Sequence, residues 1–429
     1  MANAAAHEPL PAGVDPCDAP GHGHAALPLD EARVRMVAAI VPVQDVEQVA
    51  LGSALGRVLA REVRSTVDVP SHRNSAMDGY ALAGRELPAT GTAWFEVVGT
   101  SWAGRPFQGE VGPGQCVRIM TGASVPAGTD TVVMQEHVRL EADRAGIEAG
   151  HRVGQNVRPA GEDIRRGELA LGAGTVVHPA ELGLLASLGV GTVTVWRKPR
   201  VAIFSTGDEL RAVGEDLGPG QIFDSNRYSL HGMLTRLGVE VLDLGVVADT
   251  REATLQAFET AAGQADAIIT SGGVSVGDAD YVTETLQRHG RFGFWKVAMK
   301  PGKPIAFGQF GRAWFFGLPG NPVSVMVTFY QLVQPALRAL AGIVATEPPI
   351  LVRASCETRL RKKPGRLEFQ RGVLARLPNG GYTVRSTGHQ GAGVLRSMSE
   401  ANCFIVLASD QSDVEPGAEV DVQPFVGLV

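Results

Sequence analysis

The sequence has few of the features that mark secreted, zinc-binding or membrane-spanning proteins. Its 429 residues include only four cysteines, and no two of them form a CxxC pair or another zinc-ligand spacing. This argues against a disulfide framework and against a structural zinc site. No run approaches 18 apolar residues without a glycine or a charge, and the N-terminus has no basic segment followed by an apolar one. We therefore expect no membrane span, no signal peptide and a cytoplasmic location.

The chain also lacks an excess of positive charge. Its formal net charge is −6 at pH 7 and its isoelectric point is about 6.0. A protein that coats nucleic acid needs a basic surface to release counterions, so we expect no nucleic-acid partner. A local basic pocket for a small anion is compatible with this balance. Glycine is abundant, at 53 residues, and predicts many tight turns and close backbone approach to a ligand.

The pattern of apolar residues predicts a multidomain α/β protein. We expect a disordered tail, an elongated linker domain made of helices and strands, a β domain inserted into that linker, an α/β domain and a C-terminal β domain. Their predicted ranges are 1–27, 28–68 with 165–199, 69–164, 200–345 and 346–429, in that order. Within the linker domain, helices are predicted at Asp30–Ile40 and Val46–Leu59.

Strands and helices alternate in the α/β domain, which predicts a mostly parallel sheet with helices on both faces. Thr250 is expected to cap one helix, and Asn321 with Pro322 is expected to begin the last one. The predicted helices are 225–237, 251–262, 279–289 and 323–340. The predicted strands are 201–206, 239–244, 267–270, 294–298, 305–310 and 314–318.

Four unusual loops follow strands of this domain, where open α/β sheets bind ligands. They are Thr206–Glu209, Ser271–Asp280, Lys300–Pro304 and Pro319–Pro322. Their glycines and the start of the last helix can present backbone N–H groups to an anion. Two lysines supply positive charge, and three carboxylates supply ligands suited to Mg²⁺. The candidate residues are Gly272, Gly273, Pro319, Asn321, Lys300, Lys303, Glu209, Asp249 and Asp280.

Each of these features also has a purely structural explanation. Gly272 and Gly273 can simply turn a strand into a helix, and a carboxylate after a strand is often a helix cap. In the β domain, Asp78-Gly79 is a hairpin turn signal. The chemical interpretation depends on the convergence of four loops at one sheet edge. Neither GxxxxGK[ST] nor GxGxxG occurs at the expected place, so the loops predict a phosphoryl or nucleotidyl site of another kind.

Eight motifs, in order along the chain, resemble those of the molybdopterin molybdenumtransferase family, whose animal counterpart is the C-terminal domain of gephyrin. The resemblance extends from about Leu29 to the end of the chain. The motifs are NSAMDGYA (Asn74–Ala81), RIMTGA (Arg118–Ala123), GEDI (Gly161–Ile164), PAELGLLASLG (Pro179–Gly189), FSTGDEL (Phe204–Leu210), SGGVSVGDADY (Ser271–Tyr281), KPGKP (Lys300–Pro304) and GLPGNPVS (Gly317–Ser324).

The resemblance implies a four-domain, elongated subunit and a homodimer. It implies a reaction in which adenylylated molybdopterin and molybdate yield molybdenum cofactor and AMP, with Mg²⁺. By position, Asp249, Ser275 and Asp280 resemble the family's residues around AMP and Mg²⁺, and Glu209 resembles an essential carboxylate of that pocket. The residues that resemble the molybdate group are Lys300, Lys303, Pro304 and Arg371, with Lys296 as a further basic residue. The residues that resemble functional groups of the β domain, from the partner subunit, are Asp78, Thr121 and Asp163.

The chain departs from the family at a few positions. Ala392 stands where many relatives have serine near the oxyanion, and Ser397 is the candidate to replace that contact. Ser71-His72-Arg73 replaces a common Pro-Phe-Asp. The family's adenylyltransferase domain is not found, so we expect handover of the adenylylated pterin from a separate protein. Two alternatives stay open: a molybdopterin adenylyltransferase, and a non-catalytic scaffold like gephyrin.

Overall fold

The structure, a computed structural model, describes residues 26–272, 281–343 and 349–426. The chain forms two compact units. The first contains the residues up to Glu47 and those from Trp196 onward, and the second is Gln48–Val195. The predicted tail at 1–27 lies mostly outside the described residues, but Leu27 is buried and forms a β-bridge with Val297. The five-part division of the chain stays a prediction.

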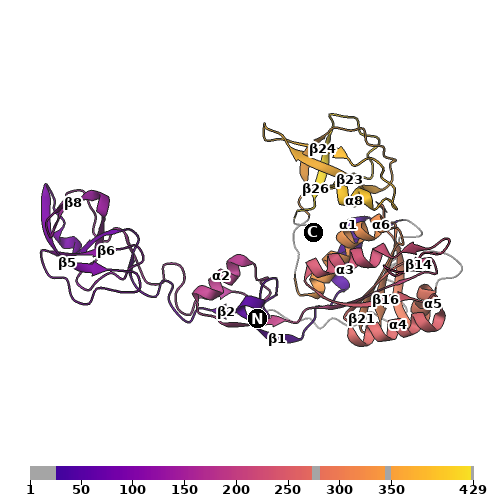
Figure 1. Cartoon of the computed structure of the whole chain (residues 1–429), viewed down its shortest axis with the longest axis horizontal. Helices are drawn as coiled ribbons and strands as arrows, with labels where there is room; N and C mark the ends of the chain where they lie inside the picture. Colours follow the sequence, from indigo (N-terminus) through magenta and orange to yellow (C-terminus); the bar gives the residue numbers. More distant parts are fainter. Residues whose placement is uncertain (1–25, 273–280, 344–348, 427–429) are drawn as a thin grey trace. The chain divides into compact units, whose positions relative to one another are not determined.

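A six-stranded sheet is the centre of the first unit (Figure 1). Its first four strands are parallel to one another, and the last two are antiparallel to their neighbours. This confirms the predicted mostly parallel sheet. In spatial order the strands are β16 (Glu240–Val247), β13 (Arg200–Thr206), β17 (Ala267–Ser271), β21 (Ala313–Leu318), β20 (Pro304–Phe310) and β18 (Gly290–Lys296).

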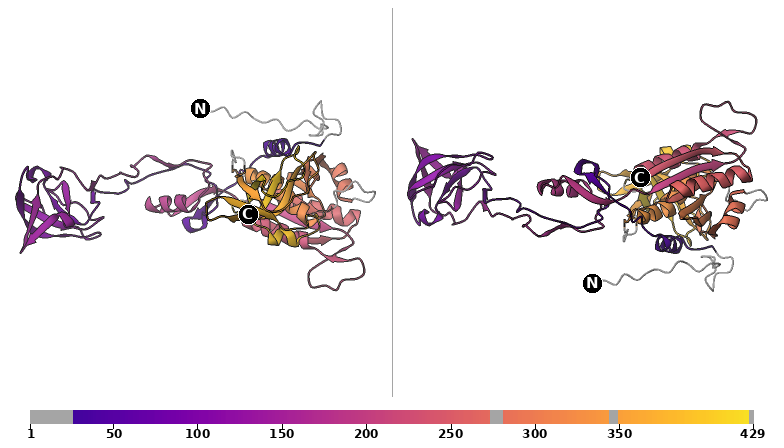
Figure 2. Two further views of the ribbon diagram at one scale, coloured as in Figure 1. Left: turned by 90° about the horizontal axis from the view of Figure 1, so that it is seen from above. Right: turned by 90° about the horizontal axis from the view of Figure 1, so that it is seen from below.

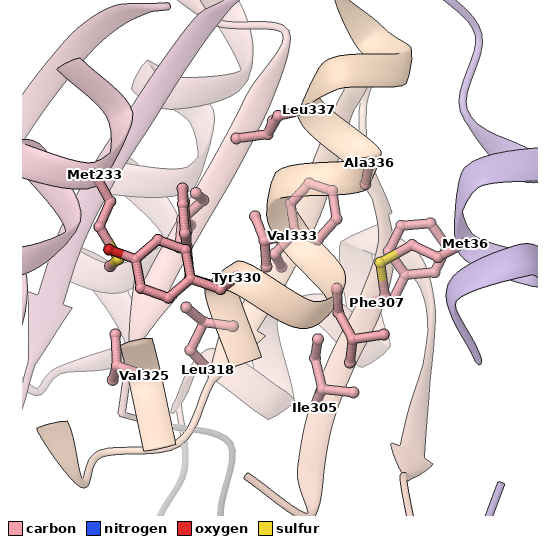
Figure 3. Close-up of a cluster of buried hydrophobic side chains, with 14 of the residues drawn as sticks. Met36, Met233, Ile305, Phe307, Leu318, Val325, Tyr330, Val333, Ala336 and Leu337 are labelled. Carbon is pink, nitrogen blue, oxygen red and sulfur yellow. The ribbon is translucent and has the colours of Figure 1, made fainter. Parts of the chain in front are cut away.

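Helices cover both faces of this sheet because its central strands are apolar on both sides. In β13, Val201 and Ile203 face one core, and Ala202 and Phe204 face the other. Figure 3 shows the first core, where Tyr330 and Met233 lie together. The first face carries α1 (Leu29–Ala39), α3 (Ser225–Leu237), α6 (Pro322–Thr328), a π-helix (Phe329–Val333) and α7 (Gln334–Leu340). The second carries α4 (Arg251–Gln264) and α5 (Tyr281–His289).

The C-terminal segment forms a second six-stranded sheet in the same unit, coloured yellow in Figure 2. Phe369, Met398 and Phe404 from this segment join the first core, so the two sheets share one apolar interior. The strands are β19 (Met299–Lys300), β23 (Leu367–Arg376), β24 (Tyr382–Ser386), β22 (Val352–Cys356), β26 (Glu419–Pro424) and β25 (Cys403–Leu407). A short helix, α8 (Arg396–Glu400), follows β24. Because β19 belongs to the KPGKP segment, this loop lies against the C-terminal sheet.

The second unit contains a β domain with the strand order β7-β4-β6-β5-β9-β8. These strands are Thr131–Met134, Gly79–Leu82, Gln115–Ile119, Thr92–Ser101, Arg144–Glu148 and Val138–Glu141. Smaller pairs join β10 (Val157–Arg158) with β3 (Asn74–Ser75), and β11 (Leu169–Leu171) with β2 (Val63–Arg64). A third pair joins β1 (Val46–Ala50) with β12 (Thr192–Trp196), next to α2 (Pro179–Ser187). Among the described residues, no helix has the length and apolar character that crossing a membrane requires.

One of the predicted helices, Val46–Leu59, is wrong, and another, 323–340, is wrong in part. Val46–Leu59 forms strand β1 and a 3₁₀ turn at Leu51–Ser53, because β-branched residues pair with β12 and Gly52 and Gly56 weaken a helix. The predicted helix 323–340 is interrupted by the π-helix. Pro335 has no N–H to bond the Gln331 carbonyl, which accepts instead from Arg33 Nε at 3.0 Å.

Arg197 connects two carboxylates that differ in burial. Its guanidinium donates to Asp266 at 2.9 and 3.0 Å, and to Asp45 at 3.1 Å. The side chain of Asp266 is 24% exposed, whereas that of Asp45 is 76% exposed. Burial alone would raise the pKa of Asp266, but the donors from Arg197 and from the Arg200 backbone outweigh it and lower the pKa below the ordinary 3.8.

We expect Asp266→Asn to lower the free energy of unfolding by about 2 kcal/mol, because a partly buried charge-assisted pair is lost. The matched variant Asp45→Asn should cost less than about 1 kcal/mol. Because the folded pKa of Asp266 is lowered, its contribution is complete above pH 3.8 and is lost as the pH falls through the lowered value. Urea unfolding from pH 7 to 3 measures both effects. Equal losses for the two variants, or a loss from Asp266→Asn that persists at pH 3, would contradict this assignment.

Candidate functional site

The strands that precede the predicted loops of the α/β domain end at one edge of the central sheet, and residues 273–280 of the second loop lie outside the described residues. The strand register places Thr206 beside Val247, Ser271 beside Leu318, and Lys296 beside Pro304. The parallel strands end at this edge, and β20 begins there. Five strand spacings of about 4.8 Å separate the outer strands by roughly 24 Å. Glu209 and Asp249 therefore follow strands at one end of the edge, and Lys296 and Pro304 lie at the other.

Carboxylates gather where β13 and β16 end, and we call Asp208, Glu209 and Asp249 the acidic end. Burial, followed by the negative charges of Asp208 and Glu209, raises the pKa of Asp249 above its ordinary value. Gly207 has a φ of +150°, and a Cβ there would lie 2.5 Å from Glu209 Oε2. A side chain at position 207 would be strained by this φ and would displace the Glu209 carboxylate from its place over the end of β13.

Glycines also line the middle of the edge. Gly272, with a φ of +90°, donates its backbone N–H to the Leu318 carbonyl at 3.1 Å, and a Cβ there would meet the Thr206 carbonyl at 3.3 Å. Gly320 lies close by, and its carbonyl accepts from Asn226 Nδ2 at 2.7 Å. Pro319 is buried, and Asn321 is exposed at the start of α6. Asn321 occupies the predicted N-cap position but makes no side-chain capping bond. The predicted residues Gly273, Ser275 and Asp280 lie outside the described residues.

A pocket of about 720 Å³ lies where the KPGKP loop meets the C-terminal sheet, and we call it the basic pocket. Among its described lining residues, six carry positive charge and one, Glu368, is acidic. The basic residues are Lys300, Lys303, Arg359, Arg361, Arg366 and Arg371. The pocket therefore unites three of the predicted oxyanion residues, and its charge suits a small multivalent anion. Lys296 and Pro304 lie beside the loop rather than in the lining.

Arg371 is the largest fully buried side chain of the described structure, with 1% exposure. Its Nε donates to Ser397 Oγ at 3.0 Å, and its terminal nitrogens donate to the carbonyls of Gly391 and Phe369 at 3.1 and 3.5 Å. Burial lowers the pKa of Arg371 to about 10, with Glu368 opposing, so the guanidinium is charged at pH 7. Keeping a charge in this environment is costly, which favours a functional reason for it.

Of the positions that depart from the family pattern, Ala392 lies next to the Gly391 carbonyl that accepts from Arg371, and the candidate replacement Ser397 also contacts Arg371. Ala392 lines the basic pocket, and its carbonyl accepts from the Val323 N–H of α6 at 3.0 Å. Ser397 is buried beneath Arg371 and donates to the Val394 carbonyl at 2.7 Å. Ser397 is not among the lining residues of the pocket, and its hydroxyl supports Arg371 from below.

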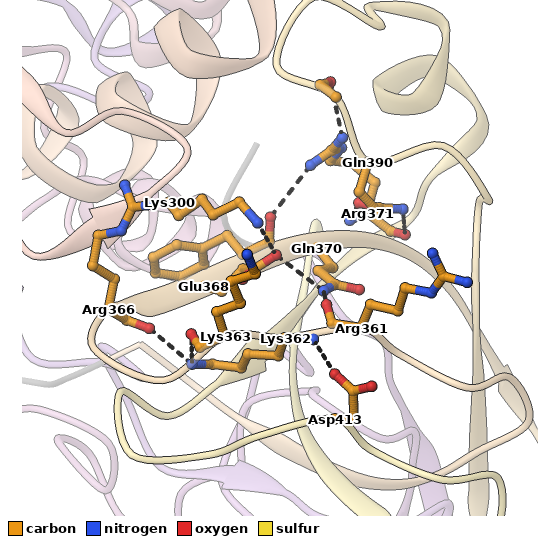
Figure 4. A network of polar contacts seen from close by, with 12 residues as sticks. Lys300, Arg361, Lys362, Lys363, Arg366, Glu368, Gln370, Arg371, Gln390 and Asp413 are labelled. Carbon is orange, nitrogen blue, oxygen red and sulfur yellow. Dashed lines mark hydrogen bonds and ion pairs between the residues drawn. The ribbon is translucent and has the colours of Figure 1, made fainter.

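Sequence reasoning missed much of the basic pocket. The run Arg359–Arg366 contributes three arginines, and Lys362 fastens this loop by donating to the carbonyls of Lys363 and Arg366 at 3.3 and 3.0 Å (Figure 4). The backbone N–H of Lys362 also donates to Asp413 Oδ1 at 2.8 Å. The density of positive charge in RLRKKPGR was the available signal, because a run with five cations in eight residues marks an anion-binding surface.

In the second unit, two of the three predicted residues lie together. The backbone N–H and the hydroxyl of Thr121 each donate to Asp78 Oδ1 at 2.7 Å. These two hydrogen bonds, the backbone one first, lower the pKa of Asp78. Asp163 lies exposed on another loop, where its N–H donates to the Val69 carbonyl at 2.9 Å. The sequence motif therefore places an ionised carboxylate on the β domain.

We expect Thr121→Val to raise the pKa of Asp78, because the hydroxyl donor is lost while the backbone donor stays. A pH titration of the Asp78 carboxyl carbon by NMR measures this shift. The control is Thr100→Val, on strand β5, which pairs with the strand β6 that ends just before Thr121. An unchanged pKa in Thr121→Val would show that the hydroxyl does not stabilise the carboxylate.

The acidic end fits part of a magnesium site. The described residues contain no group of three or more His, Cys, Asp or Glu able to hold a metal ion. Mg²⁺, however, is commonly bound by one or two carboxylates together with substrate phosphates. Asp249, whose negative charge is disfavoured by Asp208 and Glu209, matches that donor chemistry.

Comparisons with known proteins agree with this geometry. Three family descriptions match in order: "MoeA N-terminal region (domain I and II)" at residues 27–189, "Probable molybdopterin binding domain" at 202–339 and "MoeA C-terminal region (domain IV)" at 353–425. The molybdopterin molybdenumtransferase of Haemophilus influenzae is 44% identical over 94% of this chain and its own full length. The one from Nostoc is 37% identical over 94% of both chains.

A solved structure shares the fold. The molybdopterin biosynthesis MoeA protein from Pyrococcus horikoshii aligns with a TM-score of 0.78 and 28% identity, over 93% of this chain and all of its own. The fold, the basic pocket and the matched regions define a multidomain transferase of molybdenum cofactor biosynthesis. The chain belongs to the molybdopterin molybdenumtransferase family.

Proposed function

We propose that this protein inserts molybdenum from molybdate into adenylylated molybdopterin, releasing AMP and forming molybdenum cofactor. The observation that carries the proposal is the basic pocket, which adjoins the same sheet edge as the acidic end. An elongated substrate carrying a pterin at one end and a nucleotide at the other suits an edge roughly 24 Å wide. The relatives' names support the same reaction.

At the basic end, Lys300, Lys303 and Arg371 would replace the hydration of molybdate, a tetrahedral dianion, and hold it beside the two sulfurs of the pterin. This is an electrostatic and positioning contribution, which is strong in a site with little water. Lys296 and Pro304 would border the same region. The glycine backbone at Gly272, with Pro319 and Asn321, would contact the anionic substrate at the middle of the edge.

At the acidic end, Asp249, with Asp280 and Ser275 of the undescribed loop, would hold the AMP moiety and Mg²⁺, and Glu209 would support that group. Mg²⁺, when bound, would polarise the phosphoanhydride as a Lewis acid. The carboxylates of this chain would hold Mg²⁺ and not the phosphates themselves, because like charges repel. Hydrolysis of the phosphoanhydride bond by water would release AMP with one phosphate and leave the other on the pterin. Loss of AMP would make metal insertion irreversible in practice.

We also propose that the active protein is a cytoplasmic homodimer. In this arrangement Asp78, Thr121 and Asp163 would reach the site of the other subunit from the β domain. The adenylylated pterin would come from a separate molybdopterin adenylyltransferase.

One experiment separates this reaction from adenylyl transfer. The protein is incubated with Mg²⁺ and either adenylylated molybdopterin plus molybdate, or unmodified molybdopterin plus ATP. We expect AMP in the first mixture and no pyrophosphate in the second. Pyrophosphate formation without AMP release would favour the adenylyltransferase, and no reaction in either mixture would favour a scaffold.

A further inference from the structure

The basic pocket contains a carboxylate that an anion site would not be expected to keep. Glu368 lies on β23, directly beside Lys300 in the parallel pairing of β19 with β23. Its side chain is 5% exposed, and it lines the pocket together with six cations. A negative charge at this place repels any bound oxyanion, so its presence calls for a specific role.

Both hydrogen bonds that the structure gives the Glu368 side chain are accepted by the same carboxylate oxygen. Lys300 Nζ and Gln370 Nε2 each donate to Glu368 Oε1 at 3.0 Å (Figure 4). Gln370 in turn donates to the Arg361 carbonyl at 2.9 Å, so the carboxylate is fixed to the loop that carries the pocket arginines. Lys300, by contrast, is half exposed and has a long flexible side chain.

We propose that Glu368 is a positioning residue with two effects: it fixes the Lys300 ammonium group in the basic pocket, and its charge limits how tightly the pocket holds a free oxyanion. An ammonium group has three donors, so Lys300 can keep the bond to Glu368 and still donate to an oxyanion. Fixing the side chain beforehand removes the need to order it during the reaction. The proposal rests on the function proposed above, because it assigns the oxyanion to this pocket.

The limit on affinity follows from charge. Six cations and one carboxylate leave a large positive excess, which attracts any abundant oxyanion as well as molybdate. A fixed negative charge a few ångströms away weakens binding of a free anion by about tenfold or more. This repulsion does not change the hydrogen bond between Glu368 and Lys300.

Three variants separate the two effects, with inorganic molybdate alone as the calorimetric probe. Glu368→Gln keeps an acceptor oxygen and removes the charge, so we expect molybdate to bind about tenfold more tightly, with faster AMP release than in Glu368→Ala. Glu368→Ala removes both, so binding tightens similarly while AMP release falls at least about tenfold. Glu368→Asp keeps the charge and should restore wild-type affinity. Glu419→Gln, an exposed acid on β26 paired with Arg353, is the matched control.

In Glu368→Ala, molybdate binding should tighten while AMP release slows. These opposite changes distinguish a positioning role from a purely structural one. A residue that only stabilises the fold would weaken binding and slow the reaction together, with a lower melting temperature in each variant. Molybdate binding by Glu368→Gln that is no tighter than wild type, or wild-type AMP release by Glu368→Ala, would overturn the proposal. Calorimetry gives this answer even if the wild-type protein releases no AMP, an outcome that would instead refute the proposed function.

Discussion

Arg371→Met should lower molybdate-dependent AMP release by about 10²–10³-fold, the usual effect of removing one preorganised donor from a reacting anion. The same variant should keep a melting temperature within a few degrees of wild type. Arg371 is fully buried, and its side chain donates hydrogen bonds to a hydroxyl and two carbonyls rather than to a carboxylate. Glu368, the nearby carboxylate, keeps its ion pair with Lys300 in this variant, and replacing a buried charge by an apolar side chain of similar length is often neutral for stability.

Arg353→Met is the matched control for this prediction. Arg353 lies on β22 of the C-terminal sheet, which also contains Arg371. The Arg353 side chain is 60% exposed and pairs with Glu419 and Asp421. We expect wild-type AMP release from this variant. Single-turnover rates at saturating molybdate, together with thermal unfolding curves, measure both quantities. If Arg371→Met unfolds but retains its activity in the folded fraction, the residue is structural and the assignment of the oxyanion to this pocket is wrong.

Asp249→Asn should reduce AMP release by about 10²-fold, because a carboxylate of the acidic end would no longer hold Mg²⁺ against the phosphoanhydride. Removing this charge also relieves the cost of burying it and the repulsion from Asp208 and Glu209, which together raise the pKa of Asp249. The folded state should therefore be as stable as wild type or slightly more stable. Rates measured across a range of Mg²⁺ concentrations should show that excess Mg²⁺ restores part of the activity.

The control for Asp249→Asn is Glu252→Gln, an exposed acid in the first turn of α4, three residues away. It should match wild type at every Mg²⁺ concentration. A rate loss in Asp249→Asn that Mg²⁺ does not change, or an equal loss in Glu252→Gln, would argue against a magnesium role for this carboxylate. Binding of molybdate alone should be unaffected by either variant, since the acidic end does not line the basic pocket.

The α/β domain could be predicted closely because its signals are local. The helix at 225–237 matches α3, with Asp224 capping the Arg227 N–H and Gly238 ending it in a left-handed conformation. Thr250 caps α4 as expected, with its hydroxyl accepting from the Ala253 N–H at 3.3 Å. Apolar spacing and capping chemistry act within a few residues, so the sequence carries them directly.

The parts that could not be predicted depend on distant contacts. The π-helix needs Arg33, about 300 positions earlier, to satisfy the Gln331 carbonyl that Pro335 leaves free. Glu368 joins the basic pocket only because β23 pairs with β19, which lies in the chain between β18 and β20 of the α/β sheet. Strand pairing between domains leaves no spacing pattern in the sequence. Lys300 was found from its place in a loop after a strand, and Arg371 through resemblance, whereas Glu368 and Lys362 required the structure.

The most direct test of the proposed reaction is a reconstitution with purified protein, adenylylated molybdopterin, Mg²⁺ and molybdate. AMP and protein-bound molybdenum are quantified in the same samples over time. We predict that AMP appears only when molybdate is present, with one molybdenum atom incorporated into the pterin for each AMP released. AMP release at the same rate without molybdate, or molybdenum uptake without AMP, would contradict the account.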